Sequence, residues 1–211
     1  MSKATTTVAF FDFDGTLTTG DTLMPFLKFV VGKPKYYAKL FLISPVLVAY
    51  FAKVIRNDVA KEIVLKQYLA GYNIDELCLL GKRFSEEVIP HMLRPEGIER
   101  LRWHQNQGHD CVLVSASIDV YLDSWSNNNG FEAAITTQLQ NVAGVVNGKI
   151  LNKNCYGDEK VRQIKFWLNG RKTLKTYAYG DTPGDLPMLS AVNSGWLLKG
   201  NLKIKLWEEV I

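Results

Sequence analysis

An apolar stretch that ends in two acids, Asp12 and Asp14, constrains the fold of this chain more than any other feature. Residues 8–11 are apolar, and Gly15 follows the second acid and permits a sharp turn. Side chains two residues apart in a strand point to the same side, and two like charges held that close need a cation or a proton between them. Open α/β sheets bind ligands at the carboxyl ends of their strands. An Asp-Gly pair is also typical of an ordinary turn.

Apolar stretches and helical patterns alternate through the second half of the chain, which predicts an α/β fold. Strands separated by helices form a parallel, doubly wound sheet of the Rossmann-like kind. A hairpin is also expected over residues 145–150, because Asn147-Gly148 is a typical two-residue turn. The predicted strands cover residues 6–13, 111–114, 134–139, 176–179 and, as the last one, 196–198; the predicted helices cover 95–103, 119–125 and 159–168.

Between the first strand and the rest of the sheet lies a block with helical patterns and no clear strand. Helices are expected over residues 23–31, 61–69 and 73–88, with Gly32 and Gly71 as end signals. The block interrupts the sheet, so we expect an all-helical cap inserted into a catalytic core. The predicted boundaries are 19–90 for the cap, and 1–18 with 91–211 for the core.

Three further features lie where predicted elements begin or end. Ser115 follows the second core strand, where a hydroxyl and a backbone N–H can bind phosphate oxygens. Lys160 lies at the start of a predicted helix, where the helix dipole disfavours a cation, so a lysine is less expected there than an acid. The ordinary interpretation is still an exposed surface lysine. Asp181 and Asp185 again place two acids after an apolar strand. Asp185 is also typical of a cap for the helical residues 186–189.

These four motifs, in this order, resemble those of the haloacid dehalogenase superfamily of phosphotransferases. The helical insert lies where that superfamily carries a type-1 cap, as in subfamily IB with phosphoserine phosphatase. The resemblance implies that Asp12 is a nucleophile that forms an aspartyl-phosphate, and that Asp14 is the general acid and base. It also implies that Ser115 and the N–H of Ala116 hold phosphate oxygens. Lys160 would then neutralise charge between Asp12 and the phosphoryl group.

The same resemblance implies a Mg²⁺ cofactor. Its ligands would be Asp12, Asp181 and the main-chain carbonyl of Asp14, with Asp185 bound directly or through water. A set of carboxylates without a thiolate or imidazole cluster suits such a hard cation.

The sequence leaves the substrate open. The phosphoserine phosphatase pattern Ser-Gly-Gly-Phe is replaced by residues 115–118, Gly184 replaces Asn, and Asp21 replaces the Glu that grips the substrate amino group. Asp21 is also typical of a helix cap. These departures argue against phosphoserine itself, and we expect a Mg²⁺-dependent hydrolase of a small phosphorylated metabolite. Residues 12–23, 115–117 and 154–160 look more like those of generic phosphatases related to phosphatidylglycerophosphate phosphatases. The alternative is therefore a peripheral-membrane phosphatase of a phospholipid phosphate such as phosphatidylglycerophosphate.

Residues 40–52 bear on this choice, because they contain no charge and are flanked by Lys39 and Lys53. Thirteen residues are too few to cross a bilayer, which needs about twenty. The stretch either lies at an anionic membrane surface, or packs inside the cap or against a second subunit in a homodimer. Pro45 is expected to bend or divide this helix.

Composition excludes other classes of function. A net charge of +4 without a basic stripe gives no support for nucleic-acid binding. Three distant cysteines, Cys78, Cys111 and Cys155, fit neither a disulfide framework nor a zinc site. The first seven residues are polar and lack the apolar region of a signal peptide. We therefore expect a cytoplasmic protein, peripheral at the inner membrane if the lipid alternative holds.

Overall fold

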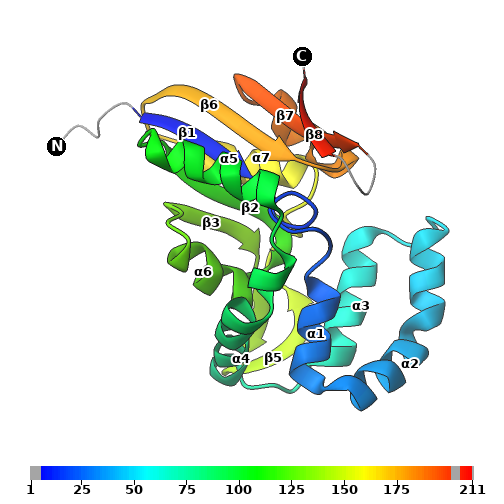
Figure 1. Cartoon of the computed structure of the whole chain (residues 1–211). Helices are drawn as coiled ribbons and strands as arrows, with labels where there is room; N and C mark the ends of the chain where they lie inside the picture. Colours follow the sequence, from blue (N-terminus) through cyan, green and yellow to red (C-terminus); the bar gives the residue numbers. More distant parts are fainter. Residues whose placement is uncertain (1–5, 201–204, 211) are drawn as a thin grey trace.

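A six-stranded sheet forms the centre of the computed structural model, which describes residues 6–200 and 205–210 (Figure 1). The prediction for the first five residues falls outside this range. Neighbouring strands are parallel except at one edge, where the last two are antiparallel. The order is β3 (Ala133–Thr137), β2 (Asp110–Ile118), β1 (Thr6–Phe11), β6 (Thr173–Gly180), β7 (Ser194–Gly200) and β8 (Lys205–Val210).

Helices cover both faces of this sheet, which confirms the predicted doubly wound fold. Side chains of β1 alternate between two apolar clusters: Ala9 and Phe11 belong to one, and Val8 and Phe10 to the other. The first cluster is completed by α5 (Pro95–Asn106) and α6 (Asp119–Asn128), and the second by α7 (Asp158–Leu168) and α8 (Leu186–Ser190).

The edge strand β8 and the small hairpin correct the sequence prediction. The predicted last strand corresponds to β7, and a further strand, β8, follows it at the edge of the sheet. Lys199 of β7 and Glu208 of β8 form an exposed ion pair, and charged side chains are typical of an edge strand. The hairpin joins β4 (Leu139–Val142) to β5 (Val145–Ile150), so the turn lies at Gly144 and not at Gly148. Gly148 is needed instead for packing, because a Cβ there would lie 2.2 Å from the Cα of Lys66. The predicted strand 134–139 is divided between β3 and β4.

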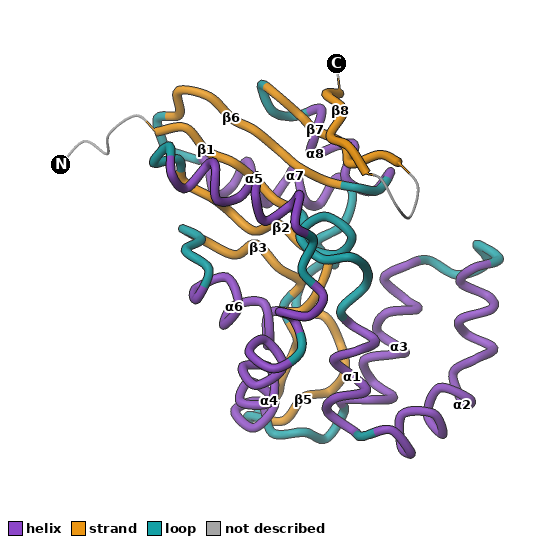
Figure 2. Tube along the Cα trace, viewed as in Figure 1, coloured by secondary structure: helices purple, strands orange, loops and turns teal. Residues whose placement is uncertain are grey.

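Four helices and a short 3₁₀ turn occupy the chain between β1 and α5 (Figure 2), and α1, α3 and α4 correspond to the three helices expected there. Asn73 caps the last of these helices, since its side chain accepts hydrogen bonds from the N–H groups of Asp75 and Glu76. The predicted cap boundaries remain a prediction. The elements are α1 (Leu23–Val31), α2 (Lys33–Phe51), α3 (Asn57–Leu69), α4 (Ile74–Glu87) and the turn Ile89–Met92.

Helix α2 lies at the outer side of this helical insert, away from the sheet (Figure 1). The predicted division at Pro45 is wrong, because the helix continues through it. Proline cannot donate to the carbonyl of Phe41, and the Ser44 hydroxyl donates to that carbonyl instead, at 2.8 Å. Ile43 is buried, so only one side of the helix packs internally. The other side exposes Phe41, Leu42, Val48 and Phe51.

Candidate active site

The first motif forms a tight loop at the carboxyl end of β1. Asp12 N–H donates to the carbonyl of Tyr179 at 2.9 Å, which extends the pairing of β1 with β6. The carbonyl of Phe13 then accepts from three successive N–H groups, the closest at 2.9 Å. Gly15 has a φ of 81°, and a Cβ there would lie 2.1 Å from Asp181 Oδ2. Only glycine fits at this position, because both the backbone and the neighbouring acid demand it.

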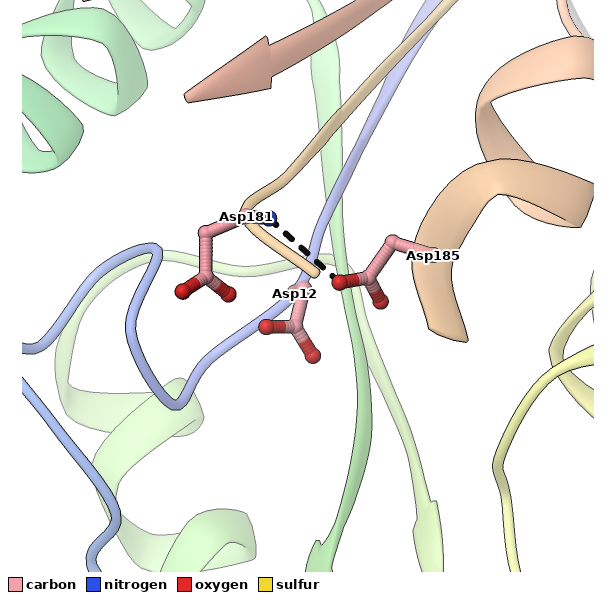
Figure 3. Close-up of side chains that lie close together, drawn as sticks. All are labelled: Asp12, Asp181 and Asp185. Carbon is pink, nitrogen blue, oxygen red and sulfur yellow. Dashed lines mark hydrogen bonds between the residues drawn. The ribbon is translucent and has the colours of Figure 1, made fainter. Parts of the chain in front are cut away.

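Three acids from two motifs meet at this edge of the sheet (Figure 3). One oxygen from each of Asp12, Asp181 and Asp185 lies within 4.8 Å of the others. Asp12 and Asp185 are buried, and Asp181 is half-buried. Burial and the nearby Asp185 charge raise the pKa of Asp12 to about 8, despite the opposing effect of Lys160. Burial is the larger cause and the Asp185 carboxylate the second, so a further cation beside Asp12 would lower its pKa.

Lys160 is the cation of this cluster. It lies in the first turn of α7 and is only 2% exposed. Its Nζ donates to Asp12 Oδ1 at 2.5 Å and to Asp185 Oδ1 at 2.7 Å. Burial alone would lower the pKa of Lys160, but the two carboxylates outweigh burial and raise it. The lysine is therefore charged and is not the surface residue that its position alone would suggest.

Asp185 has a second set of contacts. Its Oδ2 accepts from Thr182 N–H at 3.1 Å, from the Thr182 hydroxyl at 2.7 Å and from Asp181 N–H at 3.3 Å. These bonds close the 3₁₀ turn Pro183–Asp185, whereas α8 receives no cap from this side chain. The alternative role of Asp185 as a cap of the following helix is therefore wrong, since Oδ1 accepts from Lys160 and Oδ2 accepts from the preceding turn.

The Asp14 carboxylate lies outside the acidic cluster. Its Oδ1 accepts from the N–H and the hydroxyl of Thr22, at 2.8 and 2.6 Å, and its Oδ2 accepts from Ser117 Oγ. Burial raises the pKa of Asp14 to about 6, with a further contribution from Asp21. Asp14 is thus held separately from Asp12, between the start of the helical insert and β2.

The second motif, Ser115, lies within β2, whereas the sequence predicts it directly after that strand. Pairing of β2 with β3 shifts register between Val114 and Ile118, and Ser115 lies in this interruption. Ser115 is buried, and its Oγ accepts from Ser117 N–H at 3.0 Å. The prediction missed Ser117, although its place two residues after Ser115 in a strand puts both on one side.

A cavity of about 650 Å³ joins these residues. Its walls contain every predicted site residue except Asp181, and the helical insert supplies the facing wall. The core lines it with Asp12, Asp14, Ser115, Ala116, Lys160 and Asp185; the insert lines it with Asp21, Lys61 and the apolar Leu23, Met24, Pro25, Leu47, Tyr50, Phe51 and Val64.

The profile of the haloacid dehalogenase-like hydrolases matches residues 9–190, which is most of the chain. The chain belongs to this family. Protein CicA of Caulobacter vibrioides is 32% identical over 181 residues, which cover 85% of this chain and 80% of that protein. Phosphoserine phosphatase SerB1 of Mycobacterium tuberculosis is 23% identical, covering 95% of this chain and 67% of that protein.

A crystal structure of a protein of unknown function from Bordetella pertussis has the same fold. It superposes with a TM-score of 0.79 at 24% identity and covers 91% of this chain and 89% of that one. Together with the phosphatase names among the relatives, family membership confirms the prediction of a hydrolase of the phosphatase type.

One departure from the phosphoserine phosphatase pattern has a structural reason. A Cβ at Gly184 would lie 2.4 Å from the ring of Tyr156, so the asparagine of that pattern would require this ring to move. Tyr156 and Lys160 both line the cavity. The aromatic ring and the glycine are therefore a matched pair that shapes this site.

Proposed function

We propose that this protein is a Mg²⁺-dependent phosphomonoester hydrolase that works through an aspartyl-phosphate on Asp12 and acts on a small phosphorylated metabolite in the cytoplasm. The observation that carries the proposal is the buried Asp12–Lys160–Asp185 arrangement at the carboxyl edge of the sheet. Phosphoryl transfer needs positioning and charge neutralisation above all, and a buried carboxylate fixed beside an ammonium provides both.

The proposed reaction has two steps. A carboxylate oxygen of Asp12 attacks phosphorus, and the bond from phosphorus to the alcohol oxygen breaks while Asp14 donates a proton to that oxygen. Asp14 then takes a proton from water, whose oxygen attacks phosphorus and releases the Asp12 carboxylate. The pKa of Asp14, about 6, suits a group that must give and then accept a proton near neutral pH.

The chain's own groups would hold the phosphoryl oxygens. Ser115 Oγ and the N–H of Ala116 lie at the register shift of β2, and Lys160 faces Asp12 from the opposite side. Their charges and dipoles favour the transition state, in which negative charge crowds between the phosphoryl group and Asp12.

The donor set fits a hard divalent cation. The three carboxylates lie close enough together to coordinate a single ion. A bound cation would add a second positive charge to that of Lys160 and relieve the repulsion between the carboxylates. Asp12, Asp181, Asp185 and the main-chain carbonyl of Asp14 would hold Mg²⁺. The bound ion would neutralise charge on the phosphoryl oxygens and fix their orientation.

The test is hydrolysis of a panel of phosphorylated metabolites, phosphoserine included, by wild type and Asp12→Asn. The amide is nearly isosteric but is a poor nucleophile, so turnover should fall by several orders of magnitude. Chelation of Mg²⁺ should abolish wild-type activity as well. Asp75→Asn, at an exposed position on α4, is the matched control and should behave as wild type. More than about a hundredth of wild-type turnover in Asp12→Asn would refute covalent catalysis.

A second candidate, a phosphatase of phospholipid phosphates at the inner membrane surface, has its own supporting observation. Helix α2 exposes 79% of Phe41 and 76% of Phe51, and Phe51 also lines the cavity that contains Asp12. The exposed Lys33 and Lys35 lie at the start of the same helix. Apolar side chains with nearby lysines suit an anionic bilayer surface. Among the described residues, no helix is long and apolar enough to pass through a bilayer.

Sedimentation with anionic and neutral vesicles distinguishes the two candidates. The lipid candidate predicts binding to anionic vesicles at low salt, and release by Phe41→Asp with Val48→Asp, because these exposed residues would put charge into the apolar face. The double variant must remain folded and still hydrolyse a soluble ester. A wild type that ignores the vesicles but forms a dimer dissociated by the same variant would assign this face to a second subunit instead.

A further inference from the structure

Lys61 is a cation of the active-site cavity that the reaction described above does not use. It lies on α3, in the helical insert, and its side chain reaches the core. Its Nζ donates to the main-chain carbonyl of Ala116 and to Asn154 Oδ1, the latter at 3.1 Å. Since Ala116 is the residue after Ser115, Lys61 stands beside the proposed phosphate site.

The acceptors of Lys61 are neutral and fixed. Asn154 Oδ1 also accepts from the Thr137 hydroxyl at 2.9 Å, and its amide donates to Asn57 Oδ1 at 2.8 Å. Within the part of the chain that the structure describes, no carboxylate forms an ion pair with Lys61, whereas Lys160 contacts two. An ammonium has three N–H groups, so two protein acceptors leave capacity for a ligand.

The enclosed position of Lys61 disfavours its charge. Burial lowers the pKa of Lys61 to about 8, although Asp14 and Asp21 act in the opposite direction. A bound anion would offset this cost, because a desolvated ammonium gains most from a charged partner. The transferring phosphoryl group already has Lys160, Ser115 and the metal ligands on the core side. Lys61 belongs to the facing wall, where the alcohol part of a substrate would lie.

We propose that Lys61 selects the substrate: its ammonium binds a second anionic group on the leaving alcohol. This inference rests on the proposed phosphatase function of the same cavity. The preferred substrates are then phosphomonoesters whose alcohol carries a carboxylate or a phosphate-type anion next to an apolar part, which the wall of Leu23, Leu47 and Phe51 accommodates.

Three matched esters test this assignment: butyl phosphate, the same ester with a terminal carboxylate, and the same ester with a second, terminal phosphate. Wild type should prefer one or both anionic esters over butyl phosphate by about tenfold or more in kcat/KM, the range of a charge-assisted hydrogen bond. The better of the two identifies the anion. In Lys61→Met the ratio of kcat/KM for the anionic ester to kcat/KM for butyl phosphate should approach one, mainly because KM for the anionic ester rises.

Two further variants separate charge from structure. Lys61→Gln keeps N–H donors for the Ala116 carbonyl but lacks the charge, so it should lose the preference as Lys61→Met does. Lys61→Arg keeps the charge and should retain much of the preference for the anionic ester. Lys66→Met, on the exposed side of the same helix, is the control and should leave the preference as in wild type.

The contrary result is equally clear. The assignment is wrong if Lys61→Met lowers kcat/KM by the same factor for all three esters, or if wild type shows no preference among them. Lys61 would then serve only as a structural contact between α3 and β2. Dissociation constants of the same esters, measured by calorimetry on Asp12→Asn with and without Lys61→Met, decide the matter independently of turnover. Absence of hydrolysis by wild type would refute the phosphatase proposal, while these constants would still judge Lys61.

Discussion

The carboxyl edge of the sheet and helix α2 place charge and apolar surface in opposite ways. At the sheet edge, Asp12, Lys160 and Asp185 are buried charges. On α2, Phe41 and Phe51 are apolar side chains left in solvent. Burying a charge is costly unless it is paired, and leaving an aromatic ring exposed forfeits its burial free energy. Each arrangement therefore costs stability.

The two regions differ in how the cost is offset. At the sheet edge, the Lys160 ammonium and the hydrogen bonds of Thr182 offset part of this cost within the protein. On α2, nothing in the described chain covers the exposed rings, and only Ile43 is buried. The acids at the sheet edge are therefore paired within one chain, whereas the apolar α2 face is left uncovered by the described residues. Perturbing each region should therefore have different consequences.

The largest effect is expected from Lys160→Ala. Loss of the ammonium leaves two buried carboxylates unpaired and removes the charge that stabilises the transition state, so kcat should fall about a thousandfold with a smaller change in KM. Steady-state kinetics with a soluble ester measure this. Lys199→Ala removes an exposed pair with Glu208 and is the control, which should leave kcat as in wild type. An unchanged rate in Lys160→Ala would return that lysine to a structural role.

Stability should separate the two regions in the same way. Phe13→Ala deletes a fully buried ring in the loop at the carboxyl edge of the sheet, and should lower the free energy of unfolding by about 3–5 kcal/mol. Phe41→Ala deletes an exposed ring on α2 and should change it by less than about 0.5 kcal/mol. Denaturant titration measures both. A large loss in Phe41→Ala would mean that the α2 face contributes to the fold, and the comparison would fail.

Gly184 and Tyr156 test how tightly the catalytic edge is packed. Gly184→Asn should destabilise the protein by about 1–3 kcal/mol, because the new side chain overlaps the Tyr156 ring. Adding Tyr156→Ala should recover much of that loss by removing the obstacle. A double-mutant cycle in thermal unfolding gives the coupling. Additive effects would show that the ring and the glycine are not a matched pair.

His104 is a buried titratable group without a counter-charge, in contrast to Lys160. Its Nε2 contacts the Tyr179 hydroxyl at 2.9 Å, and burial lowers its pKa to about 3, with help from His109. The unfolded chain therefore binds the proton between the ordinary pKa of about 6.5 and 3, so stability falls as pH falls through that window.

This contribution should be at most about 1.4 kcal/mol per pH unit, the limit for one proton. The free energy of unfolding, measured from pH 7 to 4 for wild type and His104→Gln, isolates it, and the variant should show the shallower decline. Equal slopes would mean that His104 is solvated in the native state.

The strands of the core and the four motifs could be read from the sequence because their causes are local. Apolar runs such as residues 8–11 have few alternatives to a buried strand, and acids at their ends are conspicuous. The edge strand β8 escaped prediction because an exposed edge needs no apolar run. The hairpin turn was predicted at Gly148 because glycine is typical of turns. Glycine also allows close packing, and the contact with Lys66 that shows this role is visible only in the structure.

Lys61 shows the limit of the approach. Nothing in the pattern of α3 distinguishes it from a solvated lysine, because its partners, Ala116 and Asn154, are distant in sequence. Ser117 could have been predicted from the sequence, because residues two apart in a strand lie on the same side and Ser115 was already a candidate. Side chains that depend on contacts between the insert and the core therefore require the structure.

The central claim is that Asp12 carries the phosphoryl group, and one measurement tests it most directly. Asp14→Asn should still form the covalent intermediate but hydrolyse it slowly, because the amide cannot activate water. The variant is mixed with Mg²⁺ and a phosphomonoester, quenched in acid, digested and analysed by mass spectrometry. The account predicts one added phosphate on the peptide that contains Asp12, and none in Asp12→Asn. Phosphate on another residue, or turnover by wild type with no phosphorylated peptide at any time, would contradict it.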